Sequence, residues 1–179
     1  VRPTIEGMAA EEHPYQGVLY VGLMLTESGP RVLEYNARFG DPETQVLMPR
    51  LDEDWCALLH ACATGGLEDA RLSWSSEAAV CVVMSSGGYP GSYPKGLPME
   101  GVDEADGMDG VNVFHAGTKR DDQGRFVTSG GRVLGVTALG RDLEAARDRA
   151  YEAVQRIRWD GEHHRTDIAL DALRQHAES

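Results

Sequence analysis

The sequence contains no apolar run long enough to cross a bilayer. Residues 16–25, QGVLYVGLML, are apolar nearly throughout, but a membrane-spanning helix needs roughly 20 such residues. The opening residues, VRPTIEGMAA, also lack the charged-then-apolar order of a secretory signal peptide. We therefore expect a cytoplasmic protein that does not act at a membrane.

Basic residues are scarce as well. The chain carries 17 Lys and Arg against 29 Asp and Glu, which gives a formal charge of -12 at neutral pH. This balance disfavours nucleic acids and anionic membranes as main partners. With 41% hydrophobic and 26% charged residues, the composition is otherwise that of a soluble globular protein.

Cysteine is rare and odd in number. Cys56, Cys62 and Cys81 stand in apolar surroundings, which favours small buried side chains over a disulfide framework.

An initiator methionine is missing too, because the chain opens at Val1 in a stretch typical of the middle of a protein. We expect a segment of a longer chain, with a processed or trimmed terminus as the alternative.

Hydrophobic periodicity predicts a mixture of strands and helices. Strands are expected at residues 16–25, 31–36, 78–86, 111–116 and 132–140, and helices through residues 46–48, 55–62, 143–157 and 170–173. Asp52 and Asp142 precede two of these helices and are expected to cap their N-termini. The expected fold class is α/β of the α+β type, with mostly antiparallel strands and a module boundary near residue 70.

Two oxygen-bearing side chains lie two residues apart on the strand at 31–36. Because side chains alternate along a strand, Glu34 and Asn36 project from one face and Leu33 and Tyr35 from the other. A carboxylate and a carboxamide are hard oxygen ligands, which suit Mg²⁺ better than zinc. Many surface strands carry such pairs, so the spacing alone is a weak signal for a metal site.

The residues around this pair resemble a known family. The run LEYNARFGDPETQ at 33–45 is similar to the signature of phosphoribosylamine-glycine ligases, also called glycinamide ribonucleotide synthetases, which are ATP-grasp enzymes of purine synthesis. Further segments agree in the same order along the chain: PTIEGM at 3–8, GVLY at 17–20, GYPG at 88–91, HAGT at 115–118 and GGRVL at 130–134. The resemblance therefore covers nearly the whole chain.

The resemblance implies a reaction and a domain plan. ATP phosphorylates the carboxylate of glycine, and the amine of 5-phosphoribosylamine displaces phosphate to give glycinamide ribonucleotide, ADP and phosphate. Residues 1–66 would be the C-terminal part of the ATP-grasp core, and residues 70–179 the small C-terminal domain. The N-terminal half of the same enzyme, which holds most of the nucleotide pocket, would be the missing partner, and the enzyme would be a monomer.

The resemblance also implies roles for residues near the strand. Glu34 and Asn36 would bind Mg²⁺ or Mn²⁺, which bridges ATP phosphate oxygens and neutralises charge during transfer. Arg38 would steady the transferred phosphoryl group or the acyl phosphate. Asp41 and Glu43 would grip an ammonium group, either that of glycine or the sugar amine. The alternative for both carboxylates is a solvated turn in which Glu43 favours a helix start.

Candidate substrate ligands follow in the second module. Residues 87–96, GGYPGSYPKG, are too rich in glycine and proline for regular structure, so their amides and Lys95 are candidates to hold the 5-phosphate of the sugar. An ordinary connection is the alternative, because the loop lacks the P-loop pattern. His115 and Arg132 lie in family-like segments and are candidates for the substrate cleft or for purely structural roles.

The sequence departs from the family at one position, and two other functions are kept as alternatives. Ala169 stands where the family usually carries glycine after Asp-Ile, which bears on the packing of the last helix. Carboxylases and carbamoyl-phosphate enzymes of the same superfamily share a Glu-x-Asn-x-Arg run, but the GDPE continuation at 40–43 disfavours them. The alternative from another class is a non-catalytic module that holds a sugar phosphate.

Overall fold

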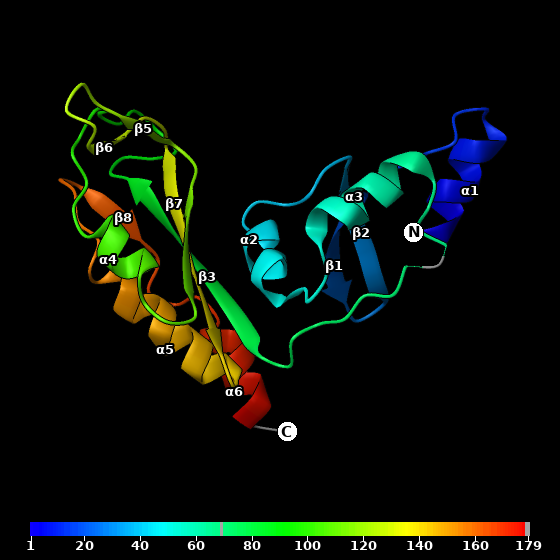
Figure 1. The fold of residues 1–179 in the computed structure, drawn as a ribbon. Helices are drawn as coiled ribbons and strands as arrows, with labels where there is room; N and C mark the ends of the chain where they lie inside the picture. Colours follow the sequence, from blue (N-terminus) through cyan, green and yellow to red (C-terminus); the bar gives the residue numbers. More distant parts are fainter. Residues whose placement is uncertain (69, 178–179) are drawn as a thin grey trace. The chain divides into compact units, whose positions relative to one another are not determined.

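The computed structural model describes residues 1–68 and 70–177. The chain divides into two compact units (Figure 1). The first comprises Val1–Thr44 with Asp52–Ser73, and the second comprises Gln45–Leu51 with the chain from Trp74 onward. The domain boundaries expected from the sequence, 1–66 and 70–179, stay a prediction. Within the described ranges, no helix combines the length and apolarity needed to span a membrane.

The first unit is built on a two-stranded hairpin. Strands β1 (Tyr20–Thr26) and β2 (Gly29–Asn36) pair antiparallel, as the sequence predicts, with a change of register between Gly22 and Leu23. Helices α1 (Arg2–Ala10) and α3 (Trp55–Thr64) belong to the same unit. Helix α1 was not predicted, although a proline at its start is favourable there, because the first turn of a helix needs no partner for that N–H.

Helix α3 begins at a different cap from the one expected. The side chain of Asp54, rather than Asp52, accepts a hydrogen bond from the backbone N–H of Ala57 at 3.0 Å. The prediction that Asp52 caps this helix is therefore wrong. Its backbone N–H instead donates to the carbonyl of Ser73 at 2.9 Å. The helix ends at Gly65, which adopts the left-handed conformation with φ of 85°.

The second unit is an antiparallel sheet with the strand order β4-β7-β3-β8. The strands are β3 (Ala78–Ser86), β4 (Val111–His115), β7 (Arg132–Gly140) and β8 (Glu162–His164), and a separate ribbon pairs β5 (Thr118–Arg120) with β6 (Phe126–Thr128). Helix α2 (Glu43–Leu47) begins in the first unit and continues into the second. The second unit also contains the 3-10 turn η1 (Met48–Arg50) and helices α4 (Val102–Asp106), α5 (Leu143–Val154) and α6 (Leu170–Ala177). The mixed, mostly antiparallel fold class is as expected.

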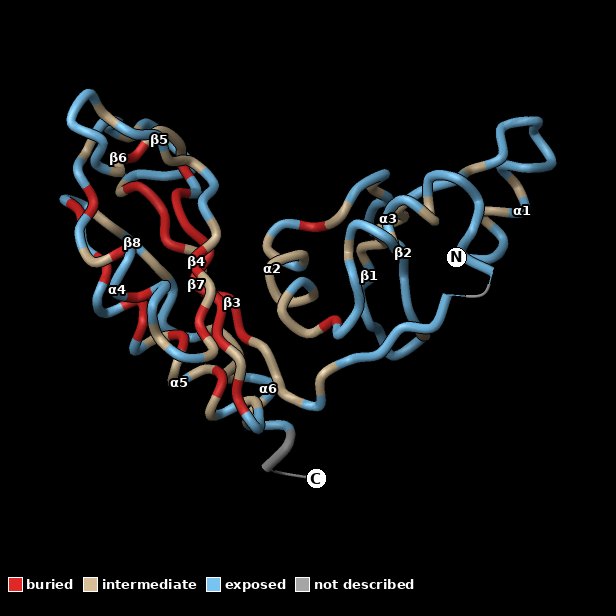
Figure 2. Tube along the Cα trace, in the orientation of Figure 1, coloured by how far each residue is buried: buried red, intermediate tan, exposed pale blue. Residues whose placement is uncertain are grey.

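The core of the second unit lies between the sheet and helix α5, where the buried segments gather in Figure 2. Asp142 caps α5 as predicted, accepting from the Ala145 N–H at 2.8 Å. The helix turns Ala146, Ala150 and Val154 toward the sheet, all fully buried. Small alanines let the helix approach the valine-rich strands closely, which keeps the packing tight.

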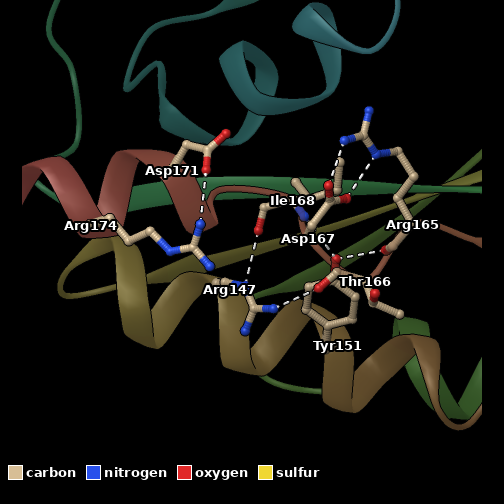
Figure 3. A network of polar contacts seen from close by, with 8 residues as sticks. All are labelled: Arg147, Tyr151, Arg165, Thr166, Asp167, Ile168, Asp171 and Arg174. Carbon is tan, nitrogen blue, oxygen red and sulfur yellow. Dashed lines mark hydrogen bonds and ion pairs between the residues drawn. The ribbon is translucent and has the colours of Figure 1, made fainter.

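The C-terminal segment is held on α5 by a polar network (Figure 3). Arg147 donates hydrogen bonds to the carbonyls of Thr166 at 2.8 Å and Ile168 at 2.9 Å, and its guanidinium stacks on the ring of Tyr151. The Tyr151 hydroxyl donates in turn to the carbonyl of Arg165 at 2.7 Å. The network satisfies the carbonyls of an irregular segment that no strand partner serves.

Candidate functional site

The two predicted metal ligands touch at the end of β2. Asn36 Nδ2 lies 3.0 Å from Glu34 Oε1, and both side chains stand on the same face of the hairpin. Gly22 lies opposite Glu34 in the register, and a side chain there would press on the Glu34 Cγ. A glycine at this position therefore leaves room for the carboxylate to lie over the strand pair.

The chemistry of this pair fits a small divalent cation. Rotation of the Asn36 amide by half a turn brings its oxygen beside the Glu34 carboxylate, because the two amide atoms exchange places. One ion can then be reached by two hard oxygen ligands, with further coordination positions left for other oxygens. Within residues 1–68 and 70–177, no three His, Cys, Asp or Glu side chains gather as a metal cluster, so the protein's donors here are the carboxylate and the amide.

A tyrosine that the sequence reasoning missed stands beside the pair. Tyr20 lies directly opposite Asn36 in the register, and its hydroxyl donates to Glu43 Oε1 at 3.1 Å. The hydrogen bond to Glu43 raises the pKa of Tyr20 above its ordinary value, with further contributions from the negative charge of Glu43, from burial and then from the charge of Glu34. Alternation along β1 places Tyr20 on the same face as Glu34 and Asn36. The pairing of the two strands could therefore have identified Tyr20 as a neighbour of the predicted metal ligands.

The loop after β2 carries the remaining candidates of the first unit. Arg38 is exposed and donates from Nη1 to the carbonyl of Phe39 at 2.8 Å, and Asp41 is also exposed. Phe39 packs edge-on against Trp55, with 5.8 Å between ring centroids. The carbonyl of Gly40 accepts from the Thr44 N–H at 3.1 Å. The loop is thus anchored at its apolar residue while its charged side chains face solvent.

The candidates of the second unit lie in segments that meet at one end of its sheet. The carbonyl of Arg132 accepts from the Gly117 N–H at 2.9 Å, and a side chain added at Gly131 would collide with the ring of Tyr89. The loop 87–96 therefore lies against the start of β7, close to the end of β4. The chain brings the glycine-rich loop, the HAGT segment and the GGRVL segment together.

The side chains at this end have local partners. His115 Nδ1 lies 3.0 Å from Thr118 Oγ1, and its ring stacks on Phe126 with 4.3 Å between centroids. The ammonium of Lys95 lies 5.7 Å from the centroid of the Tyr93 ring. Lys95, His115 and Arg132 are all exposed, so each is accessible to a ligand from solvent.

Comparison with known proteins identifies both halves of the chain. The family model "Phosphoribosylglycinamide synthetase, C domain" matches residues 79–171, and "Phosphoribosylglycinamide synthetase, ATP-grasp (A) domain" matches residues 1–44. Curated relatives include a chloroplastic phosphoribosylamine–glycine ligase of Arabidopsis thaliana, 52% identical over 98% of this chain, and the ligase of Caulobacter vibrioides, 55% identical over 97%. The chain spans only 34% and 40% of the lengths of these two relatives.

Solved structures agree with these matches. A phosphoribosylamine–glycine ligase from Thermotoga maritima superimposes with a TM-score of 0.78 at 34% identity, over 90% of this chain and 39% of the other. An N5-carboxyaminoimidazole ribonucleotide synthetase from the same organism gives 0.54 at 19% identity, over 86% of this chain and 39% of the other, a likeness that concerns the fold alone.

Proposed function

We propose, because this chain belongs to the phosphoribosylglycinamide synthetase family, that it forms the metal-binding and C-terminal part of a ligase that joins glycine to 5-phosphoribosylamine. In this reaction ATP phosphorylates the glycine carboxylate, and the sugar amine then displaces phosphate. The observation that carries the proposal is the contact between Glu34 and Asn36 on one hairpin face, inside the LEYNARFGDPE run. The N-terminal part of the same enzyme would supply the rest of the ATP pocket.

The first unit would organise the phosphates. We propose that Glu34 and Asn36 hold Mg²⁺ or Mn²⁺, which when bound neutralises the charge on the ATP phosphate oxygens. Arg38 would place its guanidinium on the transferred phosphoryl group, where a planar fork of donors matches two oxygens. Its contact with the Phe39 carbonyl involves one nitrogen, so other donors remain for a phosphate.

The acidic residues of the same loop would face the amino substrate. Asp41 and Glu43 both lie within the GDPE segment and are exposed. A carboxylate attracts an ammonium group by charge and by hydrogen bonds, so the pair suits glycine or the amine of the sugar. Glu43 is already oriented by Tyr20.

The second unit would bind the sugar phosphate. Lys95 in the glycine-rich loop, His115 after β4 and Arg132 at the start of β7 present cationic or hydrogen-bonding groups from segments that lie together. Gly88 and Gly96 adopt positive φ values of 95° and 80°, which helps such a loop turn its amides toward an anion. A 5-phosphate is the ligand that this chemistry favours.

Release of ADP tests the reaction. A full-length ligase with this sequence as its C-terminal part should release ADP only when glycine and 5-phosphoribosylamine are both present, and Asn36→Ala should reduce the rate strongly. ADP release that requires bicarbonate instead of glycine would indicate the carboxylase alternative. Binding of a phosphosugar that is indifferent to Mg²⁺ and to Glu34→Ala, with no ADP release, would indicate the non-catalytic module.

Location and assembly complete the proposal. We expect a cytoplasmic monomer, and gel filtration of the full-length ligase would test the assembly state. The name of the Arabidopsis relative places that protein in the chloroplast, so fractionation in the source organism is the direct test of location.

A further inference from the structure

The contact between Tyr20 and Glu43 is a built feature of the first unit. The Tyr20 hydroxyl holds one oxygen of the Glu43 carboxylate at 3.1 Å. The other oxygen lies against Gly40, which is buried, and a β-carbon at Gly40 would collide with it and press on the Tyr20 ring. The Tyr20 hydroxyl therefore orients the Glu43 carboxylate. The carboxylate occupies space that a side chain at residue 40 would fill.

This carboxylate is close to the proposed metal ligands. Tyr20 is paired with Asn36 across the hairpin, and the charge of Glu34 is near enough to act on the Tyr20 hydroxyl. A carboxylate is the ligand that Mg²⁺ and Mn²⁺ prefer, and each added carboxylate tightens cation binding. If it were released from Tyr20, Glu43 would offer a second carboxylate beside Glu34, as a third protein ligand after Glu34 and Asn36.

We propose that Tyr20 is a positioning residue that withholds Glu43 from the cation and reserves its carboxylate for the ammonium group of the amino substrate. The inference rests on the proposed function of the Glu34 and Asn36 pair. Its physical sense is that a cation held by only two protein ligands keeps positions open for phosphate oxygens. A third protein ligand would fill one of them and also remove the carboxylate that attracts the ammonium.

The test measures how tightly Mn²⁺ alone binds to the 179-residue chain. The electron paramagnetic resonance signal of free Mn²⁺ is the readout. Tyr20→Phe removes the hydroxyl and keeps the ring, so it should bind Mn²⁺ about fivefold more tightly than the unaltered chain. Gly40→Ala displaces the flexible end of Glu43 by another route and should give the same gain. The double variant Tyr20→Phe with Glu43→Gln should return to the affinity of the unaltered chain.

Tyr35→Phe is the matched control. Tyr35 lies on the other face of the same hairpin, and its hydroxyl also has one hydrogen-bond partner, Thr4 Oγ1 at 2.9 Å. This variant should leave Mn²⁺ affinity unchanged. Circular dichroism shows whether each variant is folded. Because Tyr20→Phe and Gly40→Ala release Glu43 independently, the test can be completed even if one of these variants does not fold.

The outcomes separate the inference from the proposed function. Equal or weaker Mn²⁺ binding by a folded Tyr20→Phe or Gly40→Ala chain overturns the positioning role, even if the metal pair is real. A gain that persists in the double variant also overturns it, because Glu43 would not be its source. If Glu34→Ala binds Mn²⁺ as well as the unaltered chain does, the metal site itself is wrong.

Discussion

Tyr20 and Asn36 face each other across the β1–β2 hairpin, so the proposed metal site and the carboxylate of Glu43 share one surface. The strand register alone creates this proximity, since paired residues of an antiparallel ladder project to the same side. The face opposite holds Tyr35, whose side chain is about half exposed. The two proposed cation ligands are thereby gathered on one side of the hairpin.

The ionisation of Tyr20 should report directly on Glu43. The hydrogen bond and charge of Glu43 raise the pKa of Tyr20 above 10.0, because a phenolate beside a carboxylate is disfavoured. Glu43→Gln should therefore shift the Tyr20 transition to lower pH. Ultraviolet absorbance of tyrosinate measures it, with the signal of the Tyr20→Phe chain subtracted.

The same shift fixes the sign of a stability effect. A group whose pKa is higher in the folded state contributes stability below its unfolded pKa and loses it as pH rises through the folded pKa. The Tyr20 contribution should thus be intact at neutral pH and disappear above pH 10.0. Denaturation curves in which Tyr20→Phe and the unaltered chain differ more at high pH than at neutral pH would contradict this assignment.

Removal of one carboxylate should distinguish the metal site from general charge. Glu34→Gln should weaken Mn²⁺ binding about tenfold or more, because it removes the charged ligand of the pair. Glu27→Gln removes the same charge from the turn at the other end of the hairpin and should have almost no effect. Calorimetry measures both, and equal losses would mean that the chain attracts Mn²⁺ only through its net charge of -12.

Structural features that depend on a local sequence pattern could be predicted from the sequence. The two strands of the hairpin, the Asp142 cap and the positions of β3, β4 and β7 follow from alternation, from a capping side chain and from valine-rich runs. The contact of Glu34 with Asn36 also follows, because two residues on one strand share a face regardless of what surrounds them.

Features set by tertiary contacts were missed. Asp52 and Asp54 are equally good caps by type, and the backbone bond of Asp52 to Ser73 assigns the role to Asp54. Strand β8, with the sequence EHH, has no apolar alternation and exists because its residues pair with the end of β3. The role of Tyr20 depends on Glu43, which is 23 positions away in the chain. No spacing rule connects these two residues.

Arg147 should contribute more stability than an ordinary surface arginine. Its two hydrogen bonds to the carbonyls of Thr166 and Ile168 are served by a largely buried side chain, and Arg147→Ala would leave those carbonyls without their donors. We expect a loss of about 1–3 kcal/mol in the free energy of unfolding. Arg156→Ala removes an exposed pair with Glu152 and should cost under about 0.5 kcal/mol. Chemical denaturation of both variants decides, and equal costs would show that the network of Figure 3 does not hold the segment.

Ala169 adopts a left-handed backbone conformation, with φ of 65°, immediately before helix α6. A β-carbon is strained in this conformation, which glycine adopts without cost.

Ala169→Gly should therefore stabilise the second unit by about 1 kcal/mol, because the relief of strain exceeds the added freedom of the unfolded chain. The matched control is Ala172→Gly, in the first turn of α6, where the backbone is helical and the side chain exposed. That change should lower stability by up to about 1 kcal/mol. Thermal unfolding measures whether each variant is more or less stable than the unaltered chain. A decrease in stability for both variants would mean that residue 169 carries no strain in solution.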